Sequence, residues 1–244
     1  MVNRTKRGSA GKTATFTEEL KRRTAKASRD HLDESLDTME ETRFKRKYVD
    51  LIHKLSKELH FTREELESLV VIYYKLLRAN NTDRKEITKN EVKDILHDTF
   101  DITDTKMAGY IICKLDKRPG PNFSMENWLR SMSLYLRGTF DEQIKFCFEV
   151  YDIMSKGVLD PRMLMHLMSG SLLGEHDDME VLKDLVECVT KKMDLDRDGV
   201  ISLEDFRQVI VEEPLLLECF GQCLPTRLAS KAFLISFTPY IGKL

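Results

Sequence analysis

The stretch DLDRDGVISLED, residues 194–205, places acidic residues and one glycine in a regular pattern. Carboxylates stand at its first, third and fifth places, and the glycine at its sixth place permits a sharp turn. A calcium loop of about twelve residues takes oxygens from side chains at places 1, 3 and 5, a carbonyl at place 7, often a water at place 9, and a carboxylate at place 12. The pattern therefore predicts one metal site, with the ligands Asp194, Asp196, Asp198, Val200, Ser202 and Asp205.

The twelfth place departs from the usual pattern because Asp205 is one methylene shorter than glutamate. A shorter side chain favours one coordinating oxygen over two, which lowers the coordination number from about seven to about six. Six-fold coordination suits Mg²⁺. We therefore expect a single Ca²⁺ site with weakened selectivity over Mg²⁺; the alternative is a loop that keeps its shape but is empty in the cell.

The unit around this loop recurs along the chain. Polar loops begin at residues 80, 116, 152 and 194, so they are 36, 36 and 42 residues apart, and each has an apolar residue at its eighth place. Repetition at a nearly fixed period is a stronger indication than a single motif. Apolar residues at helical spacing flank the loops. Before the third loop they are Ile144, Phe148 and Tyr151, and before the fourth they are Leu182, Leu185, Val186, Val189 and Met193. After the second loop they are Trp128, Leu129, Met132 and Leu136, and after the fourth they are Phe206, Val209 and Ile210.

We therefore predict an all-α, two-lobed EF-hand fold with four helix-loop-helix hands, paired 1+2 and 3+4. The predicted parts are a basic then acidic, largely disordered N-terminal arm (1–45), a degenerate N-terminal lobe (46–136), a C-terminal lobe with one metal-competent loop (137–224) and an apolar tail (225–244). We hypothesise that Phe233, Leu234 and Phe237 of the tail occupy the apolar groove of the chain itself, the alternative being a partner's groove. Pro161 is expected to begin a helix.

Three of the four loops have lost their ligands. The third loop (152–163) carries Lys156 at the fifth place, where an ammonium repels a cation. The second loop (116–127) has Arg118 at the third place and a proline at the sixth. The first loop (80–91) has Arg84 at the fifth place, although it ends on Glu91. We predict that none of these three hands binds a metal ion, and that they serve as structure.

The stretches WLRSMSLYLRGTFDEQIKFCFEVYD (128–152), LVECVTKKMDLDRDGVISLEDF (185–206) and EEPLLLECFGQCLP (212–225) resemble the neuronal-calcium-sensor superfamily, and within it calaxin-like proteins. The resemblance implies calcium-tuned motility of cilia and flagella. It also implies an axonemal location on doublet microtubules and association with outer dynein arms or their docking complex. Calaxin-like proteins carry ligands in the second and third hands, which this chain lacks, so calcium switching should be weaker here.

Residues 1–29 hold nine basic residues against two acidic ones, and such a segment is either a solvated tail or an arm that docks on an acidic polymer such as tubulin. Aromatic residues suited to nucleic acid are lacking apart from Phe16. The five scattered cysteines indicate small buried side chains in a reducing compartment. No apolar run is long enough to span a membrane, and the opening Met1-Val2 lacks the glycine that myristoylation needs.

The composition predicts a cytoplasmic protein without membrane or nucleic-acid partners, and the resemblance implies a place in the cytoskeleton of the cilium or flagellum. No catalytic motif is present in the sequence, so an enzyme is not expected. Three hypotheses remain: a calcium-responsive subunit of an axonemal motor assembly, a structural adaptor with no calcium response, and a calcineurin-B-like subunit of a cytosolic enzyme. In each, an amphipathic helix in an apolar groove is the expected contact. The lost ligands favour the adaptor, whereas the intact acidic triplet 194–198 and Gly199 favour the calcium-responsive subunit. We therefore expect an axoneme-bound adaptor with one residual metal site.

Overall fold

The computed structural model describes residues 38–79, 84–169 and 178–239 and divides into two compact units, Met1–Lys47 and Tyr48–Leu244. In the first unit the described residues form helix α2 (Thr38–Lys47). Its first turn is acidic and its last turn is basic, a distribution that complements the helix dipole. Residues 1–37, most of the predicted N-terminal arm, lie outside the described residues.

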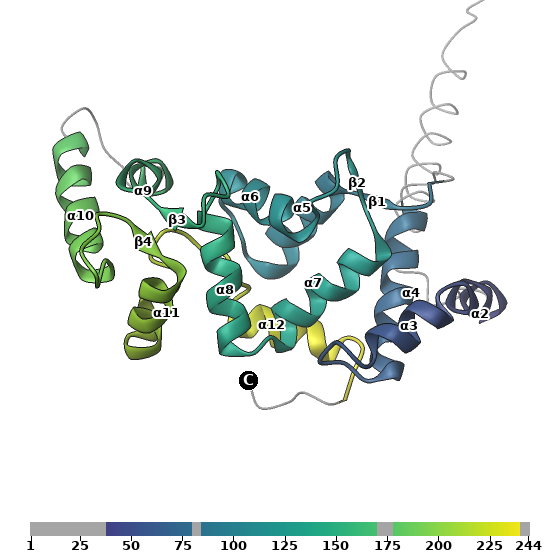
Figure 1. Ribbon diagram of the computed structural model, residues 1–244. Helices are drawn as coiled ribbons and strands as arrows, with labels where there is room; N and C mark the ends of the chain where they lie inside the picture. Colours follow the sequence, from purple (N-terminus) through teal and green to yellow (C-terminus); the bar gives the residue numbers. More distant parts are fainter. Residues whose placement is uncertain (1–37, 80–83, 170–177, 240–244) are drawn as a thin grey trace, which may run out of the picture. The chain divides into compact units, whose positions relative to one another are not determined.

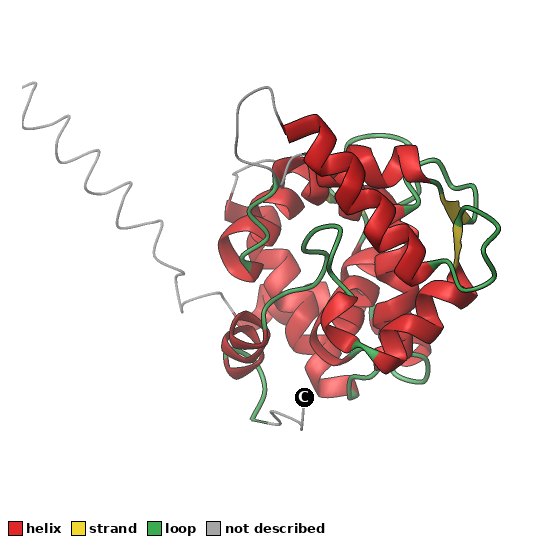
Figure 2. Cartoon of the chain, turned by 90° about the vertical axis from the view of Figure 1, so that its left-hand side faces the viewer, coloured by secondary structure: helices red, strands yellow, loops and turns green. Residues whose placement is uncertain are grey.

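The second unit repeats a helix, a loop and a helix (Figure 1). The paired helices of the four hands are α4 (Arg63–Ala79) and α5 (Lys89–Phe100), α6 (Thr105–Leu115) and α7 (Met125–Arg137), α8 (Phe140–Tyr151) and α9 (Pro161–Met168), and α10 (Asp178–Met193) and α11 (Leu203–Glu212). Helix α3 (Val49–Leu55) precedes them, and the 3-10 helix η1 (Pro214–Leu216) and helix α12 (Arg227–Ile235) follow. The predicted all-α fold is confirmed, and Figure 2 shows helices forming nearly all of its regular structure.

Short antiparallel strands join the loops in pairs. Strand β1 (Ile87–Thr88) pairs with β2 (Asn122–Phe123), and β3 (Val158–Leu159) pairs with β4 (Ile201–Ser202). The apolar residues at the eighth places face each other, Ile87 against Phe123 and Leu159 against Ile201, and all four are fully buried. The predicted pairing of hand 1 with hand 2, and of hand 3 with hand 4, is therefore confirmed.

Local sequence signals start the helix that follows each loop. The side chains of Thr88 and Ser202 each accept a hydrogen bond from the backbone N–H three residues on. The carboxylate of that later residue accepts a hydrogen bond from the backbone N–H of Thr88 or Ser202, so both hands have a capping box. Ser124 caps α7 in the same place. Pro161 is the first residue of α9, as expected, because a proline there sacrifices no intrahelical hydrogen bond.

Two aromatic side chains make hydrogen bonds that link elements of the N-terminal lobe. The hydroxyl of Tyr73 donates to the carbonyl of Phe123 (2.7 Å) and accepts from the N–H of Ile87 (3.1 Å), so α4 is tied to both strands of the first loop pair. The indole N–H of Trp128 donates to the carbonyl of Leu69 (3.2 Å) across α4 and α7. Because both side chains are buried, these polar groups need their partners.

Two details differ from the sequence-based expectation. Leu185 is 39% exposed, and of the five residues in the predicted stripe of α10 only Leu182, Val186 and Met193 are fully buried. The cysteines are not all buried: Cys147 and Cys223 are, but Cys113 and Cys188 are exposed. All five are free thiols. Exposed apolar side chains are ordinary on the surface of a folded protein, so helical spacing alone does not identify which of them are buried.

The C-terminal helix packs on the N-terminal lobe. Helix α12 contacts α5 and α7, with Leu234 fully buried and the Phe233 ring 5.4 Å from the Phe100 ring. The Phe237 ring lies 6.1 Å from that of Phe61. The three tail residues predicted to fill the chain's own groove thus contact its N-terminal lobe; residues 240–244 lie outside the described part.

Thr238 links the end of the C-terminal segment to α4. Its hydroxyl donates to a carboxylate oxygen of Glu65 (2.8 Å), and Arg137 pairs with the same carboxylate (2.6 Å). Glu65 is 3% exposed, so the charge is both buried and paired. Among the described residues, no helix is long and apolar enough to cross a membrane.

Candidate metal site

The fourth loop gathers three carboxylates between α10 and α11. One oxygen from each of Asp194, Asp196 and Asp198 lies within 4.8 Å of the other two. Asp196 and Asp198 are exposed to solvent. Carboxylate oxygens are the hard donors that Ca²⁺ and Mg²⁺ prefer, and these three supply part of the six or more oxygens that such an ion takes. The residues present therefore fit a hard divalent cation.

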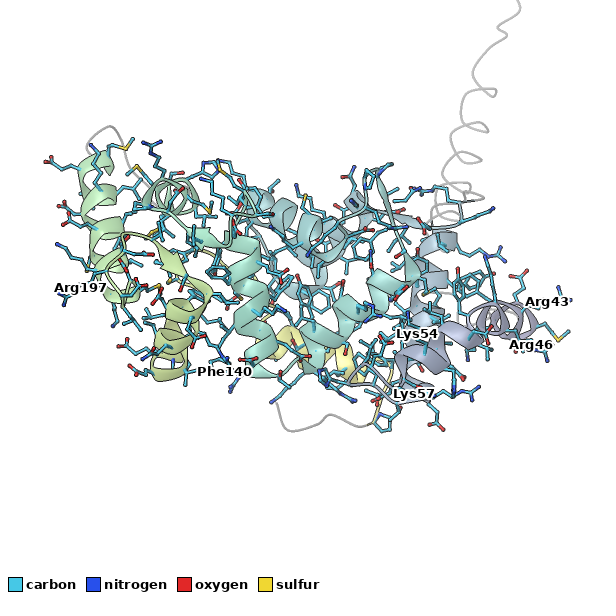
Figure 3. The ribbon with its side chains drawn as sticks, viewed as in Figure 1. Arg43, Arg46, Lys54, Lys57, Phe140 and Arg197 are labelled. Atoms are coloured by element: carbon cyan, nitrogen blue, oxygen red, sulfur yellow. The ribbon has the colours of Figure 1, made fainter. Side chains whose placement is uncertain are left out.

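The backbone of the loop shapes this cluster. Arg197 has φ 61° and Gly199 has φ 90°, both in the left-handed region, which reverses the chain between the ligand places. Figure 3 shows the Arg197 side chain pointing outward from the loop. The N–H of Gly199 donates to Asp194 (2.9 Å) and that of Val200 donates to Asp198 (2.9 Å). These hydrogen bonds orient the carboxylates of Asp194 and Asp198.

Like charges in this cluster oppose one another. The N–H of Asp198 donates to Asp196 and lowers its pKa, but desolvation and the carboxylates of Asp198 and Asp205 outweigh this, so the pKa of Asp196 is raised. A bound cation relieves such repulsion. The electrostatics of the loop thus favour a divalent ion.

Asp205, at the twelfth place, stands apart from the cluster of three. Its Oδ2 accepts hydrogen bonds from both the N–H (3.1 Å) and the hydroxyl of Ser202. One carboxylate oxygen is therefore committed to capping α11, and Oδ1 is the one left for an ion. Ser202 is committed to the same capping box. The geometry agrees with an aspartate that supplies one oxygen.

Basic residues of the first and second hands contact the second loop. The Arg118 guanidinium donates to both oxygens of Asp116, at 3.1 Å and 2.9 Å, and also reaches Glu86 of the first hand (3.3 Å). The Lys89 ammonium donates to the carbonyls of Asp116 (3.1 Å) and Arg118 (2.7 Å). Burial raises the pKa of Asp116, but the hydrogen bonds from Arg118 outweigh burial and lower it. Side chains of the chain itself thus supply the positive charge that an ion would bring.

In each of the other two loops a basic side chain also pairs with a carboxylate. In the first, Arg84 pairs with Glu91 (3.0 Å); residues 80–83, which hold its first four places, lie outside the described residues. In the third, Lys156 pairs with Asp160 (3.0 Å).

The third loop receives a second cation from another hand. The ammonium of Lys114, on α6, donates to the carbonyl of Asp152 (2.8 Å) and to the Ser155 hydroxyl (3.0 Å). The ligand places of the three loops point to Arg84, Arg118 and Lys156, but they give no sign of Lys89, Lys114 or Glu86. Each of these last three contacts a loop of another hand, and no spacing signal could have identified such a contact.

The chain matches a family model and several known proteins. A family model described as an EF-hand domain pair matches residues 141–211. Calaxin from Xenopus laevis is 38% identical over 192 residues, which is 77% of this chain and 91% of that protein. Calaxin from Danio rerio is 37% identical over 194 residues, 75% of this chain and 92% of that protein. Calcineurin B from Candida glabrata is 27% identical over 161 residues, 66% of this chain and 87% of that protein.

Proposed function

Because the chain belongs to the calaxin family of EF-hand proteins, and is a calcium-binding member of it, we propose that it is an axonemal adaptor with one residual calcium site. It would sit on the doublet microtubules of cilia or flagella, near the outer dynein arms or their docking complex, and contribute to motility. These assignments extend what the calaxin name implies for its relatives. The protein would regulate or position other proteins and catalyse nothing itself.

One contrast within the molecule carries this proposal. The fourth loop holds three clustered carboxylates with no cation among them in the described residues, whereas each of the other loops pairs a remaining carboxylate with an arginine or lysine. Ion-driven opening of a hand requires an ion to bind. A lobe whose loops carry their own cations has no such step, so the N-terminal lobe would act as fixed structure. Only the C-terminal lobe would respond to calcium.

The single site would bind Ca²⁺, with Mg²⁺ as a competitor because Asp205 supplies few oxygens. The partners would be tubulin of the doublet microtubule and dynein-arm or docking-complex proteins, contacted through an amphipathic helix. The basic residues 1–29 supply a positive charge that suits the acidic surface of tubulin. No membrane or nucleic-acid partner is proposed.

Calorimetry on the full chain tests the metal site. Ca²⁺ should release or absorb heat with a stoichiometry of about one, and Asp194→Ala should abolish it, because the first ligand is lost. Glu204→Ala is the matched control, since this neighbouring carboxylate is outside the cluster. If the wild type shows no heat with either Ca²⁺ or Mg²⁺, the protein is an adaptor with no calcium response.

Location in the cell tests the remainder. A tagged protein should concentrate in motile cilia and flagella and stay with the axoneme after detergent extraction. A calcineurin-B-like protein would instead appear in cells without motile cilia and copurify with a cytosolic enzyme. The higher identity to calaxin over more of the chain favours the axonemal proposal.

A further inference from the structure

The third loop has the backbone conformation of the fourth, although most of its ligand places are lost. In both loops the backbone N–H groups at places 5 and 6 donate to the carboxylate at place 1. These pairs are Lys156 with Asp152 (2.9 Å), Gly157 with Asp152 (2.7 Å), Asp198 with Asp194 (3.2 Å) and Gly199 with Asp194 (2.9 Å). Place 4 is left-handed in both loops, with φ 54° at Ser155 and 61° at Arg197. The third loop therefore keeps the shape of a metal loop.

A lysine of the second hand makes two contacts that support this shape. Lys114 lies in the last turn of α6, which packs against α8, the first helix of the third hand (Figure 1). Its ammonium donates to the carbonyl of Asp152, at place 1, and to the hydroxyl of Ser155, at place 4. The same carbonyl also accepts the N–H of Ser155 (3.1 Å). The ammonium thus links the two ends of the first turn of the loop.

Ser155 is the residue that most needs such support. Its φ of 54° lies in the left-handed region, which is unfavourable for a serine because of the Cβ atom. A residue stays in that region only where the surrounding contacts hold it there. The hydrogen bond from Lys114 is a contact of this kind. We therefore expect the third loop to relax when the ammonium is removed.

The third loop is joined to the metal loop through the second strand pair. Val158 pairs with Ser202, and Leu159 pairs with Ile201. Leu159 and Ile201 are fully buried, so neither strand moves independently of the other. Ser202 in turn shares its capping box with Asp205, which holds the twelfth ligand place. A displacement of β3 therefore displaces Ser202 and, with it, a predicted ligand of the ion.

We propose that Lys114 is a positioning residue for the calcium site: it holds the third loop in the shape of a metal loop, and the strand pair β3–β4 passes this shape to the fourth loop. A loop that is already ordered loses less conformational freedom when the ion binds, which raises the affinity. Coupling between two sites is reciprocal, so bound Ca²⁺ strengthens the contact of Lys114 with the third loop. The proposal deepens the adaptor function and rests on its one calcium site. It gives the N-terminal lobe a part in setting the calcium affinity.

Calorimetric titration of the full chain with Ca²⁺ tests this coupling. Lys114→Met keeps a long side chain but removes the N–H donors, and it should lower the Ca²⁺ affinity about fivefold or more. Lys114→Arg keeps the charge and the donors, and it should retain the affinity within about twofold. Lys106→Met replaces an exposed lysine of the same helix and is the matched control, with Ca²⁺ binding as in the wild type.

A second control separates positioning from a general loss of stability. Arg118→Ala removes contacts within the second loop and should destabilise the N-terminal lobe, but Arg118 makes no listed hydrogen bond to the third loop among the described residues. It should therefore lower the unfolding midpoint and leave the Ca²⁺ affinity within about twofold of the wild type. An equal loss of affinity in Arg118→Ala and Lys114→Met would overturn the proposal, as would an unchanged affinity in Lys114→Met.

Amide hydrogen exchange of the metal-free protein tests the same link without an ion. Lys114→Met should speed exchange at Leu159 and Ile201 about fivefold or more, because the strand pair opens more easily, whereas Lys106→Met should not. Unchanged exchange in Lys114→Met would contradict the proposed path. If the wild type shows no heat with Ca²⁺, the calcium site of the proposed function is wrong, and the exchange rates still decide whether Lys114 supports the fourth loop.

Discussion

The guanidinium of Arg118 lies 2.9 Å from the carboxylate of Asp116, the residue that would be the first metal ligand of the second loop. The Asp116 side chain is fully buried, and Arg118 is half exposed. An ion at this loop would have to displace the guanidinium from the carboxylate of Asp116. The positive charge beside Asp116 belongs to the chain itself, and it persists because an arginine stays protonated at all relevant pH values.

Replacing Arg118 should destabilise the N-terminal lobe. In Arg118→Ala the buried carboxylate of Asp116 loses its partner, and we expect the free energy of unfolding to fall by about 1–3 kcal/mol, a range reduced because the guanidinium is partly exposed to water. Urea unfolding at neutral pH measures this. Lys117→Ala is the control, since Lys117 is 75% exposed and lies 3.6 Å from Glu149, and it should change stability by less than about 0.5 kcal/mol.

Lengthening Asp205 should strengthen calcium binding. Glu91 shows that a glutamate at the twelfth place can make the capping box in this fold, because it pairs with Thr88 in the first hand. Asp205→Glu should therefore keep its capping bond and bring a second oxygen to the ion, raising Ca²⁺ affinity about tenfold and the preference over Mg²⁺ with it. Calorimetry with both ions measures this. An unchanged Ca²⁺ affinity would mean that the loop cannot seat a two-oxygen ligand.

Acid should loosen the contact of the C-terminal segment with the N-terminal lobe. Burial raises the pKa of Glu65, but hydrogen bonds from Arg137, Thr62 and Thr238 outweigh it, so the pKa is lowered. The unfolded chain then takes up the proton first, and the stability that Glu65 contributes is present above pH about 4.5 and lost as pH falls through the folded pKa.

Glu65→Gln should remove this part of the pH dependence, measured as the difference in urea midpoint between pH 7 and about pH 3.5. The exposed neighbour Glu64→Gln is the control and should retain the wild-type dependence. A pH profile that is the same in Glu65→Gln and in the wild type would contradict the lowered pKa.

The inner face of α12 should contribute strongly to stability. Leu234 is fully buried, and Leu234→Ala should cost about 2–5 kcal/mol through lost burial and a cavity. If α12 loosens as a result, an environment-sensitive dye should bind to the uncovered apolar surface. Ile235→Ala changes an adjacent residue that is 63% exposed, and should alter neither measurement by much. Similar effects of the two variants would show that α12 does not depend on its buried face.

Much of the fold follows from local patterns. The four loops were predictable because an apolar residue at each eighth place and stripes on the flanking helices repeat at a nearly constant spacing. The stripe of α10 was predicted imperfectly: Leu185 matches the helical period but is 39% exposed. Periodicity identifies a helix and its approximate inner face, whereas the width of that face depends on how many neighbours pack against it.

The repeat, and the one loop with carboxylates at the first, third and fifth places, can be read from the amino-acid order, because ligand spacing and helical period are properties of contiguous residues. The neutralisation of the other loops and the position of the tail depend instead on the folded chain. Lys89 and Lys114 each reach the loop of another hand, and Thr238 meets a carboxylate 173 residues away. Contacts of this kind are set by the packing of whole helices, and no local pattern encodes them.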